Sequence, residues 1–534
     1  MQMKPTKPAN LVGLLVFAGA LALYLKTMAP GLTFWDCGEF IACSYVLGVP
    51  HPPGSPLYIL LGRAFTFLPF GDPAWSVVLM SVVASALGVW CAYLTTLALT
   101  RRALGGQSLQ AFADGREVGS ILGAVVAALS LACSYTYWFN ATEAEVYGYS
   151  LLFVCLGIWL IVYWDGTQHG TSNDRWLFLI AYLFGLGGGI HLLCLLTIPS
   201  ILILAWFDDE KLRRLTVLLI CLGLWALFLL AAAGPGPASN LLTLVALAGL
   251  LYHLFNHERR SFWLLIGVVV LFAIGYSTYA SLYVRSGLNP VIDENDPETL
   301  DAFMKFLNRE QYGTDSQLLG MFSARASRVY QFWYLQMKYF FQQFPFPLLE
   351  RAIEFRRATD ANRDIVSVSL VPYLLGLGGL FWHLRQDWRR FLAILALFVI
   401  MGFGLSMYLN MPDPQPRERH YVFGGMFYAF AIWMGMGWAG IVDSLRRHVA
   451  MPAKVLVAIS LVGLAVPIGI GARLYHVEDR TADYVAFDYG YNILQSCDPN
   501  SLLFTNGDND TFPLWYLQEV EGIRKDVRVI NLSL

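Results

Sequence analysis

The sequence predicts an all-α polytopic membrane protein that carries a small α/β segment near its C-terminal end. Hydrophobic residues make up 57% of the 534 residues, whereas charged residues make up only 14%. An ordinary soluble domain carries about 25% charged residues, so the shortfall indicates that lipid surrounds much of the chain. The apolar stretches are continuous and do not alternate with polar residues, which predicts membrane helices and excludes a β-barrel.

About thirteen apolar stretches qualify as membrane helices, since a helix needs about 20 apolar residues to cross the hydrocarbon core. They are residues 10–28, 76–100, 119–135, 146–164, 176–190, 192–207, 215–233, 241–256, 261–283, 367–384, 391–409, 422–441 and 454–472. The first stretch follows two lysines, as a signal peptide would, but it is long and no clean cleavage site follows it. We therefore interpret it as a retained membrane helix.

Basic residues recur at the N-terminus and in every second loop between the predicted helices. They are Lys4, Lys7, Arg101, Arg102, Arg116, Arg175, Lys211, Arg213, Arg214, Arg259, Arg260, Arg385, Arg389, Arg390, Arg446, Arg447 and Lys454. Short loops rich in Lys and Arg lie on the cytoplasmic side of a membrane. The N-terminus is therefore predicted to be cytoplasmic, and the odd number of helices places the C-terminus on the extracytoplasmic side.

The longer loops, which carry the sequence motifs, all fall on the extracytoplasmic side. They comprise residues 29–75, 136–145, 284–366 and 410–421. We expect residues 1–472 to form a transmembrane domain and residues 473–534 to form an extracytoplasmic α/β segment that begins a larger domain. Any active site is expected on this outer side, because the cytoplasmic loops are short connectors.

The first outer loop holds two carboxylates, Asp36 and Glu39, beside aromatic residues, and His51 follows in a Pro-rich stretch. Residues three apart share one face of a helix. A carboxylate at the membrane interface can act as a general base on a hydroxyl group. The alternative is that Thr33 and Asp36 form a capping box, in which Asp36 only satisfies backbone donors.

The second outer loop holds Glu143, Glu145 and Tyr147. Thr142 and Glu145 have the spacing of a capping box that would open the following helix. That arrangement accounts for Glu145 but not for Glu143. Two acids at the top of a membrane helix are costly unless they face a wet cavity, so a binding role is the second interpretation.

Two further candidates are His191, which follows three glycines at the outer end of a predicted helix, and Arg285, which begins the long loop 284–366. His191 is either a packed interior residue or a functional group. Arg285 lies at the level of the lipid headgroups, where it can bind phosphate or anchor the helix by reaching to water. Residues 300–307 of the same loop predict a helix on the membrane surface.

Arg417 and Arg419 flank a glutamate just before a predicted membrane helix, in a loop stiffened by prolines. An arginine fork matches phosphate oxygens with two parallel hydrogen bonds. These arginines are therefore the strongest phosphate-binding candidates. The alternative is simple ion pairing with Asp413 and Glu418.

The tail predicts a short βαβ unit after an amphipathic helix at residues 481–497. Its strands are expected at 501–504 and 527–532, with a helix at 512–521 between them. The loop after the first strand carries Asp508 and Asp510, and a metal-binding acid pair is one hypothesis for it. Two strands do not form a stable sheet alone, so the unit is expected to lean on the membrane domain or to continue past Leu534.

Several of these motifs together resemble a bacterial polytopic membrane family long labelled as a domain of unknown function, which is similar to the animal plexin-type protein O-mannosyltransferase. The motifs that carry the resemblance are Phe34–Phe40 with His51–Gly54, Glu143–Tyr147, Asn289–Asn295, Asn308–Tyr312, Pro412–Arg419 and Asn506–Pro513. The resemblance covers nearly the whole chain. It implies the fold of the GT-C glycosyltransferases, which move a sugar from a polyprenyl phosphate to an acceptor with inversion.

The resemblance also implies roles for individual residues. An essential acid follows the first helix in such enzymes, and Asp36 occupies that position here, with Glu39 beside it. The donor would be held by Arg417 and Arg419, with further residues around them: His51, Glu143, Glu145, Tyr147, His191 and Arg285. Relatives usually have an acid where His420 stands, so no catalytic role is expected at that position. Neither a cofactor nor a metal is expected, since the lipid-linked sugar is itself the donor.

The predicted function is therefore transfer of a sugar, with mannose favoured, from a polyprenyl-phosphate donor to Ser or Thr hydroxyls of exported proteins. The predicted location is a bacterial inner membrane, with the active site outside. The formal net charge of −2 gives no basic field for nucleic acid. A lipid or envelope polysaccharide is the alternative acceptor. A transporter is a further alternative, although charged residues within the predicted spans are nearly absent.

Overall fold

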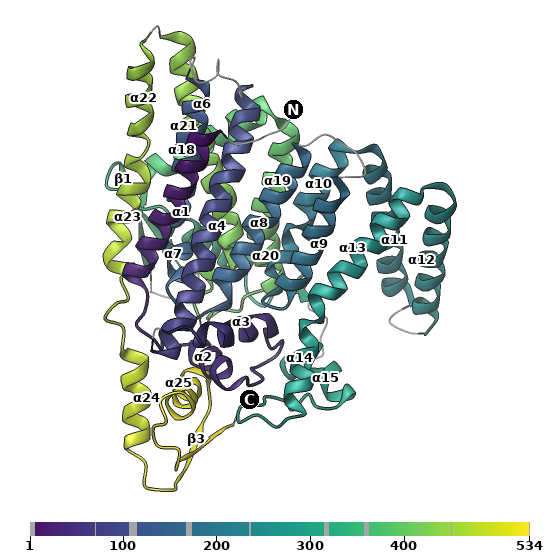
Figure 1. The fold of residues 1–534 in the computed structure, drawn as a ribbon, viewed down its shortest axis with the longest axis vertical. Coiled ribbons are helices and arrows are strands. Elements are labelled where there is room, and N and C mark those ends of the chain that lie inside the picture. Colours follow the sequence, from purple (N-terminus) through teal and green to yellow (C-terminus); the bar gives the residue numbers. More distant parts are fainter. Residues whose placement is uncertain are drawn as a thin grey trace.

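A computed structural model describes residues 6–69, 71–105, 115–166, 173–233, 237–313, 320–356, 363–415, 417–449 and 451–532. Most of these residues form a bundle of long helices that run between two ends of the molecule (Figure 1). The N-terminus lies at the upper end in this view and the C-terminus at the lower end. This arrangement agrees with the odd number of crossings that the sequence predicts.

Every predicted membrane stretch coincides with helical structure. The principal helices are α1 (Lys7–Thr27), α4 (Pro73–Leu104), α6 (Arg116–Ala132), α8 (Val146–Asp165), α9 (Asp174–Gly188), α10 (Ile198–Asp208), α11 (Glu210–Ala233), α12 (Pro237–His257), α13 (Arg259–Tyr276), α18 (Leu370–Gln386), α19 (Trp388–Val399), α21 (Gly424–His448), α22 (Ala453–Val462) and α23 (Ala465–Glu478). The chain is thus an all-α polytopic membrane protein, as predicted.

Fewer helices than the predicted thirteen are long and apolar enough to cross a membrane unaided. The described residues contain seven such helices, or eight if one bent pair counts as a single span. That pair is α6 and α7 (Tyr135–Ala141), which meet at 66°. The predicted span 192–207 begins as a 3-10 turn, and α9 has only 15 residues. Several predicted spans are therefore short or bent helices.

One predicted span starts too early. Residues 367–384 were expected to be helical, but 367–369 belong to β2 (Arg363–Ser369), and α18 begins at Leu370. β2 pairs with β1 (Glu350–Arg356) in an antiparallel hairpin, in which Ser369 lies opposite Glu350. Because the backbone of Ser369 pairs with Glu350 in the hairpin, the helix begins at the next residue, Leu370.

The centre of the bundle is formed by α21 with α6 and α18 packed against it. Gly435 and Gly123 let α21 and α6 approach so closely that a Cβ on Gly435 would lie 2.2 Å from the Gly123 carbonyl oxygen. A Cβ on Gly379 would lie 1.7 Å from the carbonyl oxygen of Trp433. Small residues at such crossings permit close backbone packing between membrane helices. These contacts fix the scaffold on which the outer loops rest.

The lower end of the molecule carries the short elements of the outer loops and the tail (Figure 1). They include α2 (Cys37–Val46), α3 (Pro56–Thr66), α14 (Ala280–Ser286), α15 (Leu300–Leu307), α24 (Val485–Gln495) and α25 (Asp508–Glu519). The predicted surface helix 300–307 is confirmed as a helix with those bounds. The tail helix expected at 481–497 is shorter, and the one expected at 512–521 begins at Asp508.

The predicted βαβ unit is also confirmed. β3 (Leu502–Thr505) and β4 (Arg528–Asn531) pair in parallel, with α25 between them in sequence. The two strands form a two-stranded sheet, and α25 packs on α2 of the membrane domain. The tail therefore leans on the first outer loop, which supplies the packing that an isolated pair of strands lacks.

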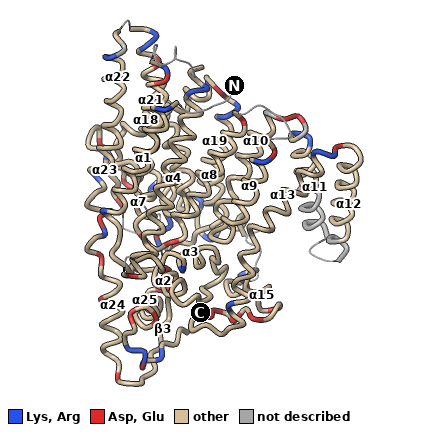
Figure 2. Tube along the Cα trace, in the orientation of Figure 1, with Lys and Arg blue, Asp and Glu red and all other residues tan. Residues whose placement is uncertain are grey.

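Charged residues are sparse through most of the bundle (Figure 2). Lys, Arg, Asp and Glu gather near the end that carries the N-terminus and around the elements at the opposite end. A charged side chain in the bilayer centre is costly, so this distribution suits a bundle whose middle lies in lipid.

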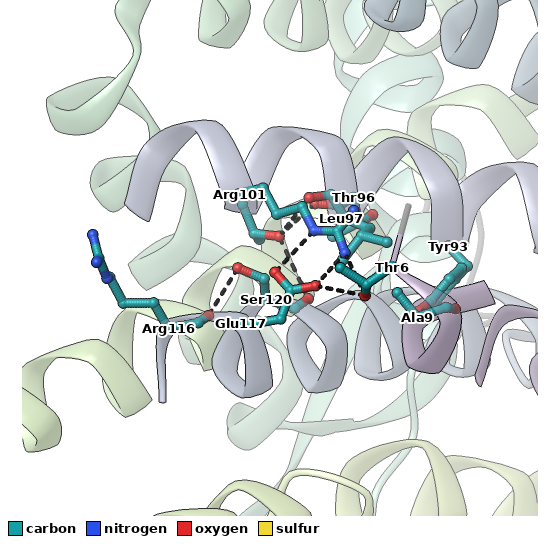
Figure 3. A network of polar contacts seen from close by, with 10 residues as sticks. Thr6, Ala9, Tyr93, Thr96, Leu97, Arg101, Arg116, Glu117 and Ser120 are labelled. Atoms are coloured by element: carbon teal, nitrogen blue, oxygen red, sulfur yellow. Dashed lines mark hydrogen bonds and ion pairs between the residues drawn. The ribbon is translucent and has the colours of Figure 1, made fainter. Parts of the chain in front are cut away.

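One buried ion pair at the N-terminal end ties three helices together (Figure 3). Arg101 of α4 is 4% exposed and Glu117 of α6 is 1% exposed. The Nε of Arg101 donates to Oε2 of Glu117 at 3.0 Å, and the hydroxyl of Thr6 donates to Oε1 of Glu117 at 3.2 Å. The Tyr93 hydroxyl donates to the carbonyl of Ala9 at 2.8 Å, which adds a second link to α1.

We expect Glu117→Gln to destabilise the protein, because it leaves the buried Arg101 guanidinium without a counter-charge. Breaking a buried ion pair by neutralising one partner costs about 3–5 kcal/mol. Thermal unfolding in detergent measures the loss. The matched control is Glu210→Gln, whose partner Arg214 and whose own side chain are each 63% exposed. Equal melting temperatures for the two variants would contradict a structural role for the Arg101–Glu117 pair.

Candidate active site

Asp36 lies at the start of α2, where the first outer loop meets the loop 410–421. It is the N-cap residue of α2, but its side chain makes no capping hydrogen bond. Its Oδ2 lies 3.4 Å from Nη1 of Arg417 instead. Thr33 does not cap the helix either, because its hydroxyl donates to Sγ of Cys37. The capping-box interpretation of Asp36 is therefore wrong, and its carboxylate remains directed at a cation.

Arg417 is held among acids and aromatic rings. Its Nη2 lies 3.4 Å from Oε1 of Glu145, and its guanidinium carbon lies 4.2 Å from the ring centroid of Trp35 and 4.8 Å from that of Tyr421. Burial opposes the charge, but Glu145 and Asp36 outweigh it and raise the pKa of Arg417. Both ion-pair distances are long for charge-assisted hydrogen bonds. Arg417 is thus a firmly charged group whose hydrogen bonds in this site are weak.

Glu145 is the buried partner of this cluster. It is the N-cap residue of α8 but makes no side-chain capping bond, so the predicted capping box with Thr142 is wrong. Burial raises the pKa of Glu145 well above its usual value, and the neighbouring charge of Asp36 raises it further. Two acids that share one arginine cannot both ionise easily. Burial and Asp36 thus both disfavour the ionised form of Glu145, whereas Arg417 favours it.

Glu39 and His51 form a second ionic unit, beside the unit formed by Asp36, Arg417 and Glu145. Nδ1 of His51 lies 2.6 Å from Oε2 of Glu39, and the His51 backbone N–H donates to Oε1 of Glu39 at 2.8 Å. Burial disfavours the imidazolium, but the Glu39 carboxylate outweighs it and raises the pKa of His51 to about 10. Asp36 and Glu39 therefore have separate partners, although they are only three positions apart in the sequence.

Glu294 was not predicted, and the structure places it against this second unit. Its backbone N–H donates to the carbonyl of Val49 at 3.0 Å, and the N–H of Val49 donates to the carbonyl of Ile292 at 2.8 Å. The Glu294 side chain is 7% exposed. Burial and the neighbouring Glu39 carboxylate raise the pKa of Glu294 to about 10. It lies in the motif Asn289–Asn295, but it is one of several acids between residues 293 and 298, and the sequence does not distinguish it from the others.

Glu143 is paired with a residue from the tail that was also not predicted. Its carboxylate contacts the guanidinium of Arg480, which lies 4.3 Å from the ring centroid of Phe139. The backbone N–H of Arg480 donates to the carbonyl of Thr27 at 3.0 Å. Arg480 thus joins the end of α1, the second outer loop and the start of the tail.

Tyr147 connects the predicted His191 to the site. The Tyr147 ring centroid lies 4.5 Å from that of Tyr421 and 5.4 Å from the His191 ring. The imidazole of His191 accepts a hydrogen bond at Nδ1 from the N–H of Leu193 at 3.2 Å. His191 therefore contacts the site through Tyr147 and caps the 3-10 helix that follows α9.

Arg285 and Arg419, the other two arginines predicted to bind phosphate, contact groups other than those around Arg417. Arg285 donates from Nε to the carbonyl of Leu47 at 2.8 Å and from Nη2 to the carbonyl of Val46 at 3.4 Å, so it satisfies the C-terminal end of α2. The backbone N–H of Arg419 donates to the Tyr339 hydroxyl at 3.3 Å. Phosphate binding by either residue stays a prediction, and the structure does not bring either onto Asp36.

The tail forms one wall of the site. The N–H of Trp35 donates to Oδ1 of Asn509 in α25 at 2.7 Å, and the Phe512 ring stacks on the His51 imidazole at 6.2 Å. Asp510 accepts from the N–H of Asn506 at 3.1 Å, which is a local capping contact. Among the described residues, no group of three His, Cys, Asp or Glu side chains has the geometry to hold a metal ion.

Two models of known protein families match parts of this chain. Residues 36–214 match the domain described as the protein O-mannosyl-transferase TMEM260 N-terminal domain, and residues 486–534 match TMEM260-associated domain 2. The first match begins at Asp36 and contains Glu39, His51, Glu143, Glu145, Tyr147 and His191. The second contains Asn509.

Two similar proteins bear the name protein O-mannosyl-transferase TMEM260. The chain is 21% identical to the one from Dictyostelium discoideum, over 97% of this chain and 57% of that protein. It is 23% identical to the one from Mus musculus, over 97% of this chain and 62% of that protein. The chain thus spans about three fifths of the length of these relatives, and the predicted resemblance to animal O-mannosyltransferases is confirmed.

A solved structure shares the fold. The crystal structure of ArnT from Cupriavidus metallidurans in the apo state superposes with a TM-score of 0.50 and 12% identity, over 95% of this chain and 84% of that chain. The GT-C-like fold predicted for the transmembrane domain is therefore confirmed.

The unit of Glu39, His51 and Glu294 makes stability depend on pH. The pKa values of Glu294 and His51 are both raised to about 10 in the folded protein, so between about pH 6.5 and 10 the folded chain keeps protons that the unfolded chain has lost. Stability must fall as pH rises through that window. We expect Glu294→Gln to make the fall shallower by up to about 1.4 kcal/mol per pH unit, because glutamine has no proton to lose.

Melting temperatures measured between pH 7 and pH 10 test this expectation. Glu298→Gln is the matched control, because it makes the same change at an exposed acid in the same loop. A Glu294→Gln profile parallel to the wild-type profile would show that Glu294 is already ionised at neutral pH.

Proposed function

We propose that this chain contains the catalytic domain of an inverting glycosyltransferase that uses a polyprenyl-phosphate sugar, with mannose as the sugar and Ser or Thr hydroxyls of exported proteins as acceptors. The proposal rests on one observation: the side chains of Asp36 and Arg417 lie 3.4 Å apart at one end of a GT-C-like helix bundle. A base and a phosphate-binding cation are the two groups that such a transfer needs. The names of the similar proteins support a protein hydroxyl as the acceptor and mannose as the sugar.

In the proposed reaction Asp36 accepts the proton of the acceptor hydroxyl. The hydroxyl oxygen then bonds to the anomeric carbon of the sugar from the face opposite the lipid phosphate. The bond between that carbon and the phosphate oxygen breaks, and the lipid phosphate leaves with the electron pair. A positioned base of this kind contributes about 10²–10⁴-fold to the rate.

Arg417 is proposed to bind the lipid phosphate. Its guanidinium is charged, is oriented by Trp35 and Tyr421, and is engaged by Asp36 and Glu145 only at 3.4 Å. A phosphate offers stronger two-point hydrogen bonds to an arginine fork than these contacts provide. When Arg417 turns to the phosphate, the carboxylate of Asp36 loses a competing positive neighbour and is freed for the acceptor.

The proposed location is a bacterial inner membrane, with a cytoplasmic N-terminus and an extracytoplasmic site. The alternation of basic loops supports this orientation. In this arrangement His51, Glu143, Tyr147 and His191 line or support the donor side of the site. No cofactor is proposed, because the donor supplies the sugar and its leaving group.

We expect Asp36→Asn to abolish transfer from polyprenyl-phosphate mannose to an exported-protein acceptor, with a loss of about 10²–10⁴-fold. Asparagine keeps the size of the side chain but cannot take the proton. Membranes that carry equal amounts of folded wild-type or variant protein are compared by radiolabelled sugar transfer. Transfer at the wild-type rate by Asp36→Asn would exclude Asp36 as the base.

We expect Arg417→Gln to raise the KM for the lipid-linked donor by roughly 10-fold or more, since a charged hydrogen bond to phosphate is worth about 1.5–3 kcal/mol. Arg417→Lys should recover part of the affinity, because it keeps the charge but not the fork. Donor titration at a fixed acceptor concentration measures this. Arg473→Gln is the control, because Arg473 is half-exposed and pairs with Glu350. An unchanged KM for Arg417→Gln would place the phosphate elsewhere.

A further inference from the structure

The backbone that carries Asp36 has an unusual conformation one residue earlier. Trp35 has φ +68, in the left-handed region that bulky side chains rarely adopt. Such a conformation persists only where its surroundings determine it, and it often occurs at functional sites. The Trp35 ring lies under the guanidinium of Arg417, so the turn places both the aromatic platform of Arg417 and the carboxylate of Asp36.

The contact that holds this turn comes from the tail, 474 residues away in sequence. Oδ1 of Asn509 accepts the N–H of Trp35 at 2.7 Å. Asn509 lies in the first turn of α25, whose N-cap residue is Gly507. The side-chain oxygen of Asn509 therefore bonds to the backbone of the first outer loop.

The backbone of α25 packs directly against the backbone of the first outer loop at Gly38. A Cβ on Gly38 would lie 2.6 Å from the carbonyl oxygen of Phe512, so only glycine fits there. Figure 1 shows α25 directly below α2 at the lower end of the bundle. At the start of the tail, Arg480 forms a backbone hydrogen bond to Thr27 and an ion pair with Glu143. The tail is thus fixed at two places around the turn at Trp35.

We propose that Asn509 is a positioning residue for the transferase reaction, which holds the Trp35 turn so that Asp36 and Arg417 face the reacting groups. This inference rests on the proposed function. The tail segment that matches TMEM260-associated domain 2 is then part of the active site and not only an appended domain. Asn509 itself does not contact the sugar or the phosphate.

Asn509→Leu tests the proposal, because leucine has a similar size but no acceptor oxygen. We expect kcat to fall by roughly 10- to 100-fold with little change in the KM for the donor, since a small displacement of a reacting group has an effect of this order. Asn509→Asp keeps an acceptor oxygen at the same place and should restore most of kcat. Asn492→Leu is the control, because it makes the same change at an exposed position of α24 in the same tail.

A second readout does not depend on activity. Hydrogen exchange of the Trp35 amide should be faster in Asn509→Leu than in wild type, Asn509→Asp or Asn492→Leu, because only the first loses the bond to that amide. Wild-type exchange and wild-type kcat in Asn509→Leu would overturn the proposal and leave the transferase function standing. If wild type transfers no sugar while the Trp35 amide exchanges as expected, the proposed function fails and the structural role of Asn509 remains.

Discussion

The half-buried guanidinium of Arg417 is the charge around which the candidate site of this protein is organised. It lies between two carboxylates and two aromatic rings, at the boundary of a bundle whose interior has few charges. A charge at this depth is stable only where opposite charge or a polar ligand meets it. The carboxyl groups of Asp36 and Glu145 both lie 3.4 Å from the Arg417 guanidinium, and burial raises the pKa of Glu145. Because these contacts are long, the guanidinium can form shorter hydrogen bonds to a phosphate in the proposed reaction.

The tail completes this arrangement from outside the membrane domain. Arg480 ties the end of α1 to Glu143, while Asn509 and Phe512 reach the first outer loop and His51. The βαβ unit gains packing from α2, and the loop around Asp36 gains a fixed conformation. Stability and catalytic geometry thus depend on the same interface, and the two matched domains, 36–214 and 486–534, meet across it.

Much of this structure could be predicted from the sequence, because its strongest signals are local. Apolar stretches located the helices, and the alternation of strand and helix located β3, α25 and β4. Asp36, Arg417 and Glu145 were selected because each lies in a short motif with aromatic residues or prolines, and the structure brings the three side chains together. The described residues contain fewer helices long enough to cross a membrane alone than the thirteen predicted stretches, because stretches such as 176–190 and 192–207 form short or broken helices that hydropathy does not reveal. The two predicted capping boxes were wrong, because the Thr-x-x-acid spacing alone does not show which partner the acid contacts. In the structure, Asp36 and Glu145 both contact Arg417 instead. The contacts of Glu294, Arg480 and Asn509 could not be predicted, since their partners lie far away in the sequence.

The anomeric configuration of the product tests the central claim most directly, because it reports how Asp36 acts. The sugar linkage in the product can be determined by nuclear magnetic resonance after transfer from a donor of known configuration. A base that activates the acceptor for a single displacement requires inversion at the anomeric carbon, and inversion is the expected result. Retention would require a covalent sugar–enzyme intermediate, and it would contradict both the role of Asp36 and the single-step reaction built on it.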